Sequence, residues 1–116
     1  MEHRQHPRLP VQFSSSFSSA NIVSGEGNLV DLSIRGCRVL SGTAVKPGTT
    51  LQLRIEVSKG QPPIEVTQAV VRWCRERSFG LEFASLAPAE WARLQQIVKE
   101  LELEPYQRGG SSSATA

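Results

Sequence analysis

Short runs in which apolar and polar side chains alternate constrain this chain more than any other feature. The clearest run is Thr50-Leu-Gln-Leu-Arg-Ile-Glu-Val57, where every second residue is leucine, isoleucine or valine. Residues 11–17 follow the same rule, with Val11, Phe13 and Phe17 on one face. Because successive side chains of a β-strand point to opposite faces, this period of two predicts strands that bury one face.

Turn signals separate these runs about every ten residues. Lys46-Pro-Gly48 and Lys59-Gly-Gln-Pro-Pro63 interrupt the alternation, and Gly25 and Gly27 indicate a hairpin connection within residues 21–28. Further strands are predicted over residues 28–33, 37–40, 64–74 and 78–84. Five or six short antiparallel strands at this spacing predict a mainly β fold, a closed or nearly closed barrel.

The hydrophobic period changes after Pro88. Apolar residues then recur every three or four positions, which predicts an amphipathic helix that starts near Pro88 and ends at Pro105. Glycine, serine, alanine and threonine make up residues 109–116, and this low complexity predicts a disordered tail over residues 105–116. The apolar positions of the helix are Leu86, Trp91, Leu94, Ile97, Val98 and Leu101.

Length and composition suit one small domain with a single hydrophobic core. The chain has 116 residues, of which 39% are hydrophobic, and it lacks the run of about 20 apolar residues that a membrane span needs. The first residues lack the apolar stretch of a secretory signal, so we expect a cytoplasmic protein without membrane insertion. Two cysteines, Cys37 and Cys74, are too few for a disulfide scaffold and are expected to be reduced.

Two polar motifs stand out from this pattern. Arg4-Gln-His-Pro-Arg8 places two guanidiniums four residues apart, just before the first predicted strand. Asp31-Leu-Ser-Ile-Arg-Gly36 contains a carboxylate, a hydroxyl and a glycine. Together they supply forked donors for a phosphate or a guanine edge, an acceptor for guanine N–H groups, and a glycine that permits close backbone approach. These residue types suit a small guanine nucleotide.

The order Arg-x3-Arg followed by Asp-x-Ser-x2-Gly resembles the PilZ domain, a bacterial receptor module for cyclic di-GMP. The resemblance extends from about Glu2 to Leu101 and implies a six-stranded antiparallel β-barrel with a C-terminal α-helix, in agreement with the periodicity. We therefore expect a flexible ligand-binding segment over residues 1–10, a barrel and helix over 11–104, and a tail over 105–116. The resemblance implies a bacterial receptor that changes conformation on binding cyclic di-GMP and signals through a partner protein that the sequence does not identify.

The resemblance assigns a role to each motif residue. Arg4 and Arg8 would grip phosphates and guanine faces or edges. Asp31 would accept from guanine N1–H and N2–H, Ser33 would bond a phosphate or a base, and Gly36 would leave clearance for the ligand. Each also has a structural interpretation. The arginines serve as solubilising charges, Asp31 and Ser33 as turn residues that bond their own backbone, and Gly36 as a source of positive φ.

Trp73 is a further candidate binding residue. It lies on a predicted strand seven residues before Gly80, where PilZ sequences often carry an aromatic residue beside the binding face. Strict alternation places Val71 and Trp73 on one side, with Arg72 and Cys74 opposite, so the structural interpretation makes Trp73 a core residue. The functional one stacks its indole on a guanine. Four other arginines, at positions 35, 38, 72 and 75, are additional cations that the sequence does not place.

Other functions find less support in the sequence. His3 and His6 have no further ligands that would complete a metal site, so no metal or cofactor is expected. We expect no enzyme, because the chain has no Gly-x-Ser-x-Gly elbow, glycine-rich phosphate loop or P-loop lysine. A formal net charge of +2 disfavours duplex DNA and single-stranded RNA or DNA as partners. The main alternative is a degenerate PilZ-like adaptor that acts by protein contacts without binding a nucleotide.

Overall fold

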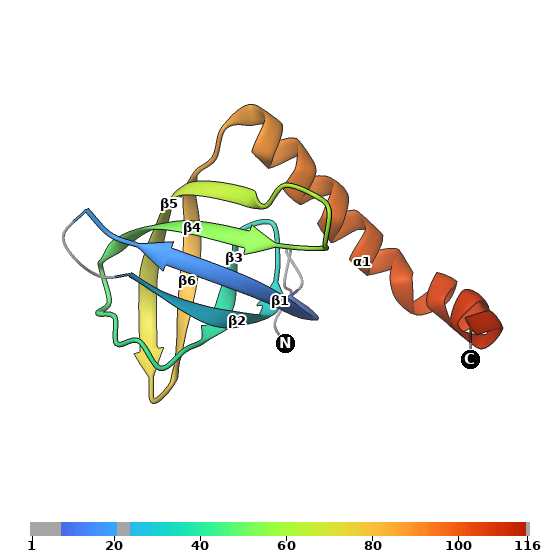
Figure 1. The fold of residues 1–116 in the computed structure, drawn as a ribbon, viewed down its shortest axis with the longest axis horizontal. Coiled ribbons are helices and arrows are strands. Elements are labelled where there is room, and N and C mark those ends of the chain that lie inside the picture. Colours follow the sequence, from blue (N-terminus) through green and yellow to red (C-terminus); the bar gives the residue numbers. More distant parts are fainter. Residues whose placement is uncertain (1–7, 21–23, 116) are drawn as a thin grey trace, which may run out of the picture.

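Six strands form a closed antiparallel barrel that is followed by one helix (Figure 1). The structure is a computed structural model that describes residues 8–20 and 24–115, with side chains as far as Leu103. Around the barrel the strands follow the order β1-β2-β3-β6-β5-β4. The predicted barrel and C-terminal helix are therefore confirmed. The elements are β1 (Leu9–Ser18), β2 (Ser24–Leu32), β3 (Gly36–Leu40), β4 (Thr50–Glu56), β5 (Ile64–Arg75), β6 (Ser78–Ser85) and α1 (Pro88–Thr115).

The alternating runs line the barrel interior as their period predicts. In β4, Leu51, Leu53 and Ile55 are buried, whereas the residues between them are exposed. Phe17 of β1 meets Phe79 of β6 edge to face, with ring centroids 5.3 Å apart. The interior is therefore a packed apolar core, and binding chemistry must be sought on the outer wall or at the ends. The buried apolar residues are Phe17, Leu29, Leu32, Cys37, Val39, Leu51, Leu53, Ile55, Ile64, Val66, Ala69, Val71, Phe79, Leu81, Leu94 and Val98.

The helix α1 packs against β5 and β1 through its apolar stripe. Leu94 and Val98 are buried in the core, and Trp91 packs against it while half-buried. Two polar contacts join α1 to the backbone at the start of β5. Glu90 accepts from the Glu65 backbone N–H at 3.1 Å, and Arg93 donates to the Pro63 carbonyl at 3.1 Å. The C-terminal part of α1 extends away from the barrel (Figure 1).

The helix continues beyond its predicted end. It spans Pro88–Thr115, so it passes Pro105 and includes most of the segment predicted to be a disordered tail. Once a helix is nucleated, each further residue that it orders adds one hydrogen bond. In the part of the chain that the structure describes, no helix combines the length and apolar character needed to cross a membrane.

The prediction for Gly25 and Gly27 was wrong. Both lie inside β2, which starts at Ser24, and not in a hairpin connection. A Cβ on Gly25 would collide with Thr43, and one on Gly27 would collide with the Leu40 carbonyl. These glycines therefore permit close contact with the chain at and after the end of β3, a role that a turn-based interpretation of sequence misses.

Candidate ligand-binding site

Residues from the two sequence motifs meet on the outer wall of the barrel. Arg8 Nη1 donates to Asp31 Oδ1 at 2.7 Å, and Arg38 Nε donates to Asp31 Oδ2 at 3.2 Å. The Asp31 side chain is 18% exposed, against 35% for Arg8 and 42% for Arg38. One carboxylate thus holds two guanidiniums that remain open to solvent, an arrangement suited to an anionic ligand.

Strand pairing explains why these residues come together. Asp31 of β2 pairs with Pro10 of β1 on one side and with Arg38 of β3 on the other. Arg38 in turn pairs with Gly80 of β6, and Gly80 pairs with Trp73 of β5. A single row across five strands therefore contains Asp31, Arg38, Gly80 and Trp73.

The side chains of this row point outward. Arg38 lies between the buried residues Cys37 and Val39, and Gly80 lies between the buried residues Phe79 and Leu81. Since the buried neighbours face the core, the residues between them face the outer side of the wall. The outer wall of β2, β3, β6 and β5 that carries Arg8, Asp31, Arg35, Arg38, Arg72, Trp73 and Glu82 is called the Asp31 face below.

Three shifts in strand register surround this row. They fall between Pro10 and Phe13 in β1, near Val30 in β2, and at Arg72 in β5. An extra residue in one strand changes the direction of the side chains that follow, and such irregularities are common beside binding sites. The Asp31 face therefore depends on departures from the regular alternation that predicted the strands.

The shift in β5 corrects the prediction that Trp73 shares a face with Val71. Val71 is buried in the core, whereas Trp73 is half-buried outside it. The indole covers the outer side of Gly80, where a Cβ would collide with Trp73 Nε1. Glycine at position 80 thus lets the ring lie flat against the strand, as an aromatic surface next to Arg38.

Ser33 lies in the turn between β2 and β3, while Asp31 and Gly36 are in the strands on either side of it. The Ser33 hydroxyl accepts from the backbone N–H groups of Arg35 and Gly36 at 3.1 and 3.2 Å, and its backbone N–H donates to the Gly36 carbonyl at 2.8 Å. The residue is 4% exposed. This geometry fits the structural interpretation of Ser33 as a turn residue, and its direct contact with a ligand stays a prediction.

Gly36 has a third role that neither interpretation anticipated. It is absent from the glycines with positive φ in the described chain, which are Gly48 and Gly60. A Cβ at position 36 would collide with the carbonyl oxygen of Leu81 on β6. Gly36 therefore permits the close pairing of β3 with β6 directly beneath the Asp31 face.

A second arginine–carboxylate group lies on the same face. Arg72 Nε donates to Glu82 Oε1 at 2.6 Å, and Arg35 Nη2 lies 3.5 Å from Glu82 Oε2. The hydrogen bond from Arg72 is the main cause that lowers the pKa of Glu82, and the charges of Arg72 and Arg35 add to it. The sequence had not placed these two arginines or Arg38, because each finds its partner on another strand and the contact depends on how the strands pair.

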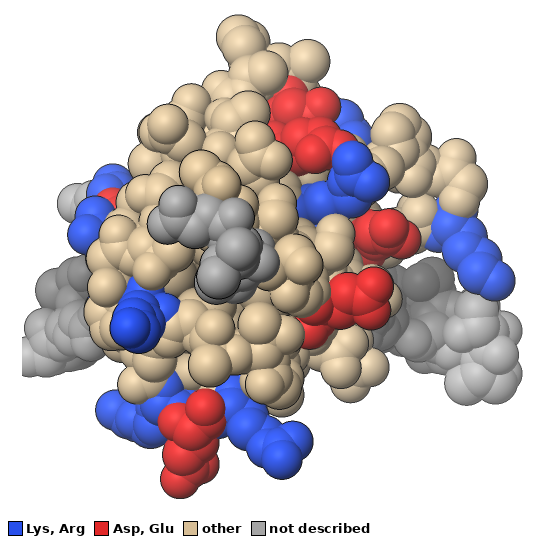
Figure 2. Space-filling view, turned by 60° about the vertical axis from the view of Figure 1, so that its left-hand side comes forward, with Lys and Arg blue, Asp and Glu red and all other residues tan. Residues whose placement is uncertain are grey.

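Charge on the outer surface is local and mixed. Figure 2 shows small groups of basic and acidic side chains separated by uncharged surface, without a broad basic area on that side of the molecule.

Beneath the Asp31 face, burial raises the pKa of the Cys37 thiol far above its usual range, with the negative charge of Asp31 adding to the effect. Cys37 is therefore a core residue and not a reactive thiol.

Several predicted residues lie outside those that the structure describes. Arg4, His3 and His6 belong to residues 1–7, so the structure does not test their proposed contacts. Among residues 8–20 and 24–103, no three side chains of histidine, cysteine, aspartate or glutamate gather as metal ligands would.

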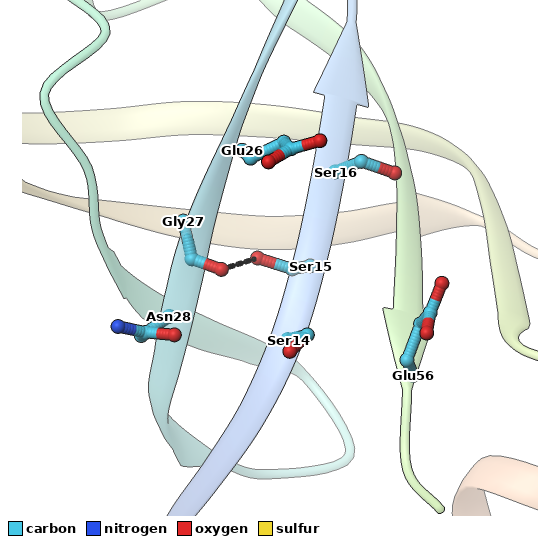
Figure 3. A pocket seen from close by; sticks show the side chains of 7 residues that line it. All are labelled: Ser14, Ser15, Ser16, Glu26, Gly27, Asn28 and Glu56. Atoms are coloured by element: carbon cyan, nitrogen blue, oxygen red, sulfur yellow. Dashed lines mark hydrogen bonds between the residues drawn. The ribbon is translucent and has the colours of Figure 1, made fainter. Parts of the chain in front are cut away.

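A hollow of about 450 Å³ lies on another part of the barrel wall (Figure 3). Serines of β1 lie along it, flanked by Glu26 and Asn28 of β2 and by Glu56 of β4. The Ser15 hydroxyl is turned inward and donates to the Gly27 carbonyl at 2.9 Å. Two carboxylates and no arginine line this hollow, so it is unsuited to a phosphate ligand. Its outward residues Ser14, Ser16, Glu26, Asn28 and Glu56 are called the serine face below.

The family model of the PilZ domain matches residues 2–100 of this chain. The chain therefore belongs to the PilZ domain family. No curated protein sequence matches the chain.

Solved structures of PilZ proteins share the fold. YcgR from Escherichia coli, solved in complex with c-di-GMP, is 19% identical with a TM-score of 0.78 over 96% of this chain and 51% of that one. The inhibitor of motility MotI/DgrA from Bacillus subtilis is 19% identical with a TM-score of 0.73 over 90% and 53%. The isolated PilZ domain of E. coli YcgR with c-di-GMP is 20% identical with a TM-score of 0.71 over 94% and 98%. This chain thus spans about half the length of the first two.

Proposed function

We propose that this protein is a cyclic di-GMP receptor and that the nucleotide binds on the Asp31 face. The observation that carries the proposal is the contact of Arg8 with Asp31, because it unites two motifs that are 23 residues apart in the chain. Membership of the PilZ family and the c-di-GMP complexes of fold neighbours support the choice of ligand.

Asp31 is the proposed recognition group for guanine. A carboxylate accepts two parallel hydrogen bonds, and guanine presents N1–H and N2–H side by side on one edge. A guanine that takes these oxygens competes with Arg8 and Arg38, and the guanidiniums are then free to bind phosphate. After this change of partner Asp31 still accepts hydrogen bonds, now from the guanine, and the guanidiniums donate to phosphate, so no polar group is left without a partner.

Trp73 and Arg4 complete the proposed site. The flat indole over Gly80 offers a stacking surface within the same row of residues as Asp31. Arg4 precedes Arg8 by four residues and is proposed to close over the ligand as the second arginine of its motif. Ser33 and Gly36 support the site indirectly, through the turn and the close pairing of β3 with β6.

Signalling is proposed to pass from Arg8 to the start of β1. When the ligand takes Asp31, Arg8 must find a new partner, and the residues before Leu9 move with it. A cytoplasmic partner protein would then recognise the rearranged N-terminal segment, which makes the two binding events thermodynamically coupled. At saturating ligand, backbone amide exchange in residues 3–9 is expected to slow, while exchange in the barrel strands changes little.

Calorimetric titration of the purified protein with cyclic di-GMP tests the proposal, with GTP and a short single-stranded oligonucleotide as comparison ligands. We expect saturable binding of cyclic di-GMP and much weaker binding of the other two. Binding of the oligonucleotide alone would identify a nucleic-acid-binding barrel. Absence of binding to all three would overturn the proposal in favour of an adaptor that acts through protein contacts.

A further inference from the structure

The Arg35–Glu82–Arg72 group repeats the arrangement found at Asp31. In both groups one carboxylate accepts from two arginines, with the closest contacts at 2.6 Å for Glu82 and 2.7 Å for Asp31. The three residues come from separate elements, since Arg35 precedes β3, Glu82 is on β6 and Arg72 is on β5. Such a group is assembled only by the tertiary structure, and neither sequence motif includes Glu82 or Arg72.

Strand pairing places the second group next to the first. Arg38 pairs with Gly80 and Gly36 pairs with Glu82, so Glu82 lies two residues further along β6 than the Asp31 row. At about 3.4 Å per residue this displacement is roughly 7 Å. Glu82 shares the outward direction of Gly80 because the residue between them, Leu81, is buried. The two groups are therefore adjacent on one wall.

The backbone holds this second group in position. The Phe83 N–H donates to the Arg35 carbonyl at 2.8 Å, which ties the β2–β3 turn to β6. Arg72 lies at the register shift of β5, where the extra residue lets both Arg72 and Trp73 face outward. The shift thus presents an aromatic surface and a guanidinium side by side.

The charges of the two groups match a ligand with two phosphates. Each group has two guanidiniums and one carboxylate, and so carries one excess positive charge. A cyclic dinucleotide carries one negative charge on each of its two phosphodiesters. Counting only the described residues, one group alone would leave half of the ligand charge without a partner on this face.

The second group is open enough to exchange partners. The side chains of Arg35 and Arg72 are 61% and 58% exposed, and that of Glu82 is 37% exposed. Exposed ion pairs contribute little to stability, whereas the fork of a guanidinium forms strong paired hydrogen bonds to phosphate. A phosphate arriving at this group is therefore able to displace the Glu82 carboxylate.

We propose that Arg35 and Arg72 form a second anion subsite for one phosphodiester of the bound cyclic dinucleotide, and that Glu82 limits the affinity by competing for both guanidiniums. The subsite rests on the proposed function, because it takes part of the same ligand. It adds a role for Arg35 within the second motif and for two residues outside both motifs, Arg72 and Glu82. It also makes Glu82 an internal competitor that sets the concentration at which the receptor responds.

The test compares the dissociation constant of cyclic di-GMP by calorimetry for the full chain and four variants, one of which, Asp31→Ala, removes the proposed guanine acceptor. Glu82→Gln frees both guanidiniums and is expected to tighten binding by about threefold to tenfold. Arg72→Gln removes a subsite donor and is expected to weaken binding by a similar factor. Glu65→Gln is the matched control, since Glu65 forms an exposed ion pair with Arg54 at 3.0 Å between β5 and β4 and its loss changes the net charge equally.

The outcomes separate this subsite from the proposed function. Tighter binding by Glu82→Gln, with Glu65→Gln unchanged, supports the subsite. If both glutamate variants bind more tightly to the same degree, overall charge sets the affinity and the subsite is overturned. It is also overturned if Glu82→Gln and Arg72→Gln match the parent while Asp31→Ala loses binding, and the proposed function then stands. A parent protein that does not bind overturns both. Cooperative thermal unfolding, with a midpoint close to that of the parent, verifies that each variant is folded.

Discussion

The Asp31 face and the serine face belong to the same barrel wall but carry opposite charge. On the Asp31 face each carboxylate is held between two arginines, so positive charge is in excess. On the serine face Glu26 and Glu56 lie beside serine hydroxyls, and none of the ion pairs found among the described residues includes either glutamate. The backbone is a strand ladder in both regions. The outward residues alone therefore decide which face suits an anion.

The comparison of the two faces also shows that a hollow in the surface need not coincide with the candidate ligand-binding site. The serine face is concave, whereas the residues predicted from the two motifs gather on the other face. A concave shape favours burial of a ligand, but carboxylates at its edge repel a phosphate. For an anionic nucleotide, charge and hydrogen-bond geometry outweigh the depth of the hollow.

The largest expected effect comes from removing the carboxylate at the centre of the Asp31 face. Asp31→Ala is expected to weaken cyclic di-GMP binding by about fivefold to 150-fold, because one paired base contact contributes about 1–3 kcal/mol. Calorimetric titration measures the change. Glu56→Ala on the serine face is the matched control and should bind as the parent does. Equal losses in the two variants would remove the distinction between the faces.

Gly36→Ala tests whether close strand pairing supports the Asp31 face. The added methyl group would collide with the Leu81 carbonyl, which is backbone and cannot rotate away. We expect a loss of about 1–3 kcal/mol in the free energy of unfolding, measured by chemical denaturation. Gly42→Ala is the control, since no atom lies within 4 Å of a Cβ at that position. A Gly36 variant as stable as the Gly42 variant would contradict the proposed close contact.

The two tryptophans allow the Asp31 face to be observed by fluorescence. Trp73 is half-buried outside the core, and Trp91 packs against the core from α1. In Trp91→Phe only Trp73 remains, and stacking of a guanine should change its emission as cyclic di-GMP is added. Trp73→Phe should abolish the change. Trp73→Ala should weaken binding near the lower end of about 1–3 kcal/mol, and an unaltered affinity would exclude a stacking role.

The smallest expected effect concerns the pH dependence of stability at Glu82. Its pKa is lowered in the folded protein, chiefly by the hydrogen bond from Arg72, so the resulting stabilisation is present above about pH 4.3, the usual value for glutamate. It is lost as the pH falls through the lowered pKa. Thermal unfolding of the parent and of Glu82→Gln should therefore show a small difference at pH 7 that disappears at lower pH. A difference in thermal unfolding that persists at low pH would mean that packing of the Glu82 side chain, and not its charge, causes it.

Much of the fold follows from the sequence because its evidence is local. The alternation in β4 and the change of period at Pro88 each reflect the geometry of a single element, so they predicted strands and a helix without knowledge of the partners. The two motifs likewise singled out Arg8 and Asp31, which the structure brings into contact. The roles of these two residues in binding a ligand stay predictions.

The tertiary structure decided what depends on how one strand pairs with another. A register shift turns Trp73 away from the core, and close approach to β6 explains Gly36, although neither leaves a periodic signature in the sequence. The placement of Arg38, Arg72 and Glu82 on one wall likewise leaves no periodic signature in the sequence, because each of these residues has its partner on another strand. Residue periodicity specifies which way a regular strand faces, but the relative positions of strands are fixed only when the whole barrel closes and packs its core.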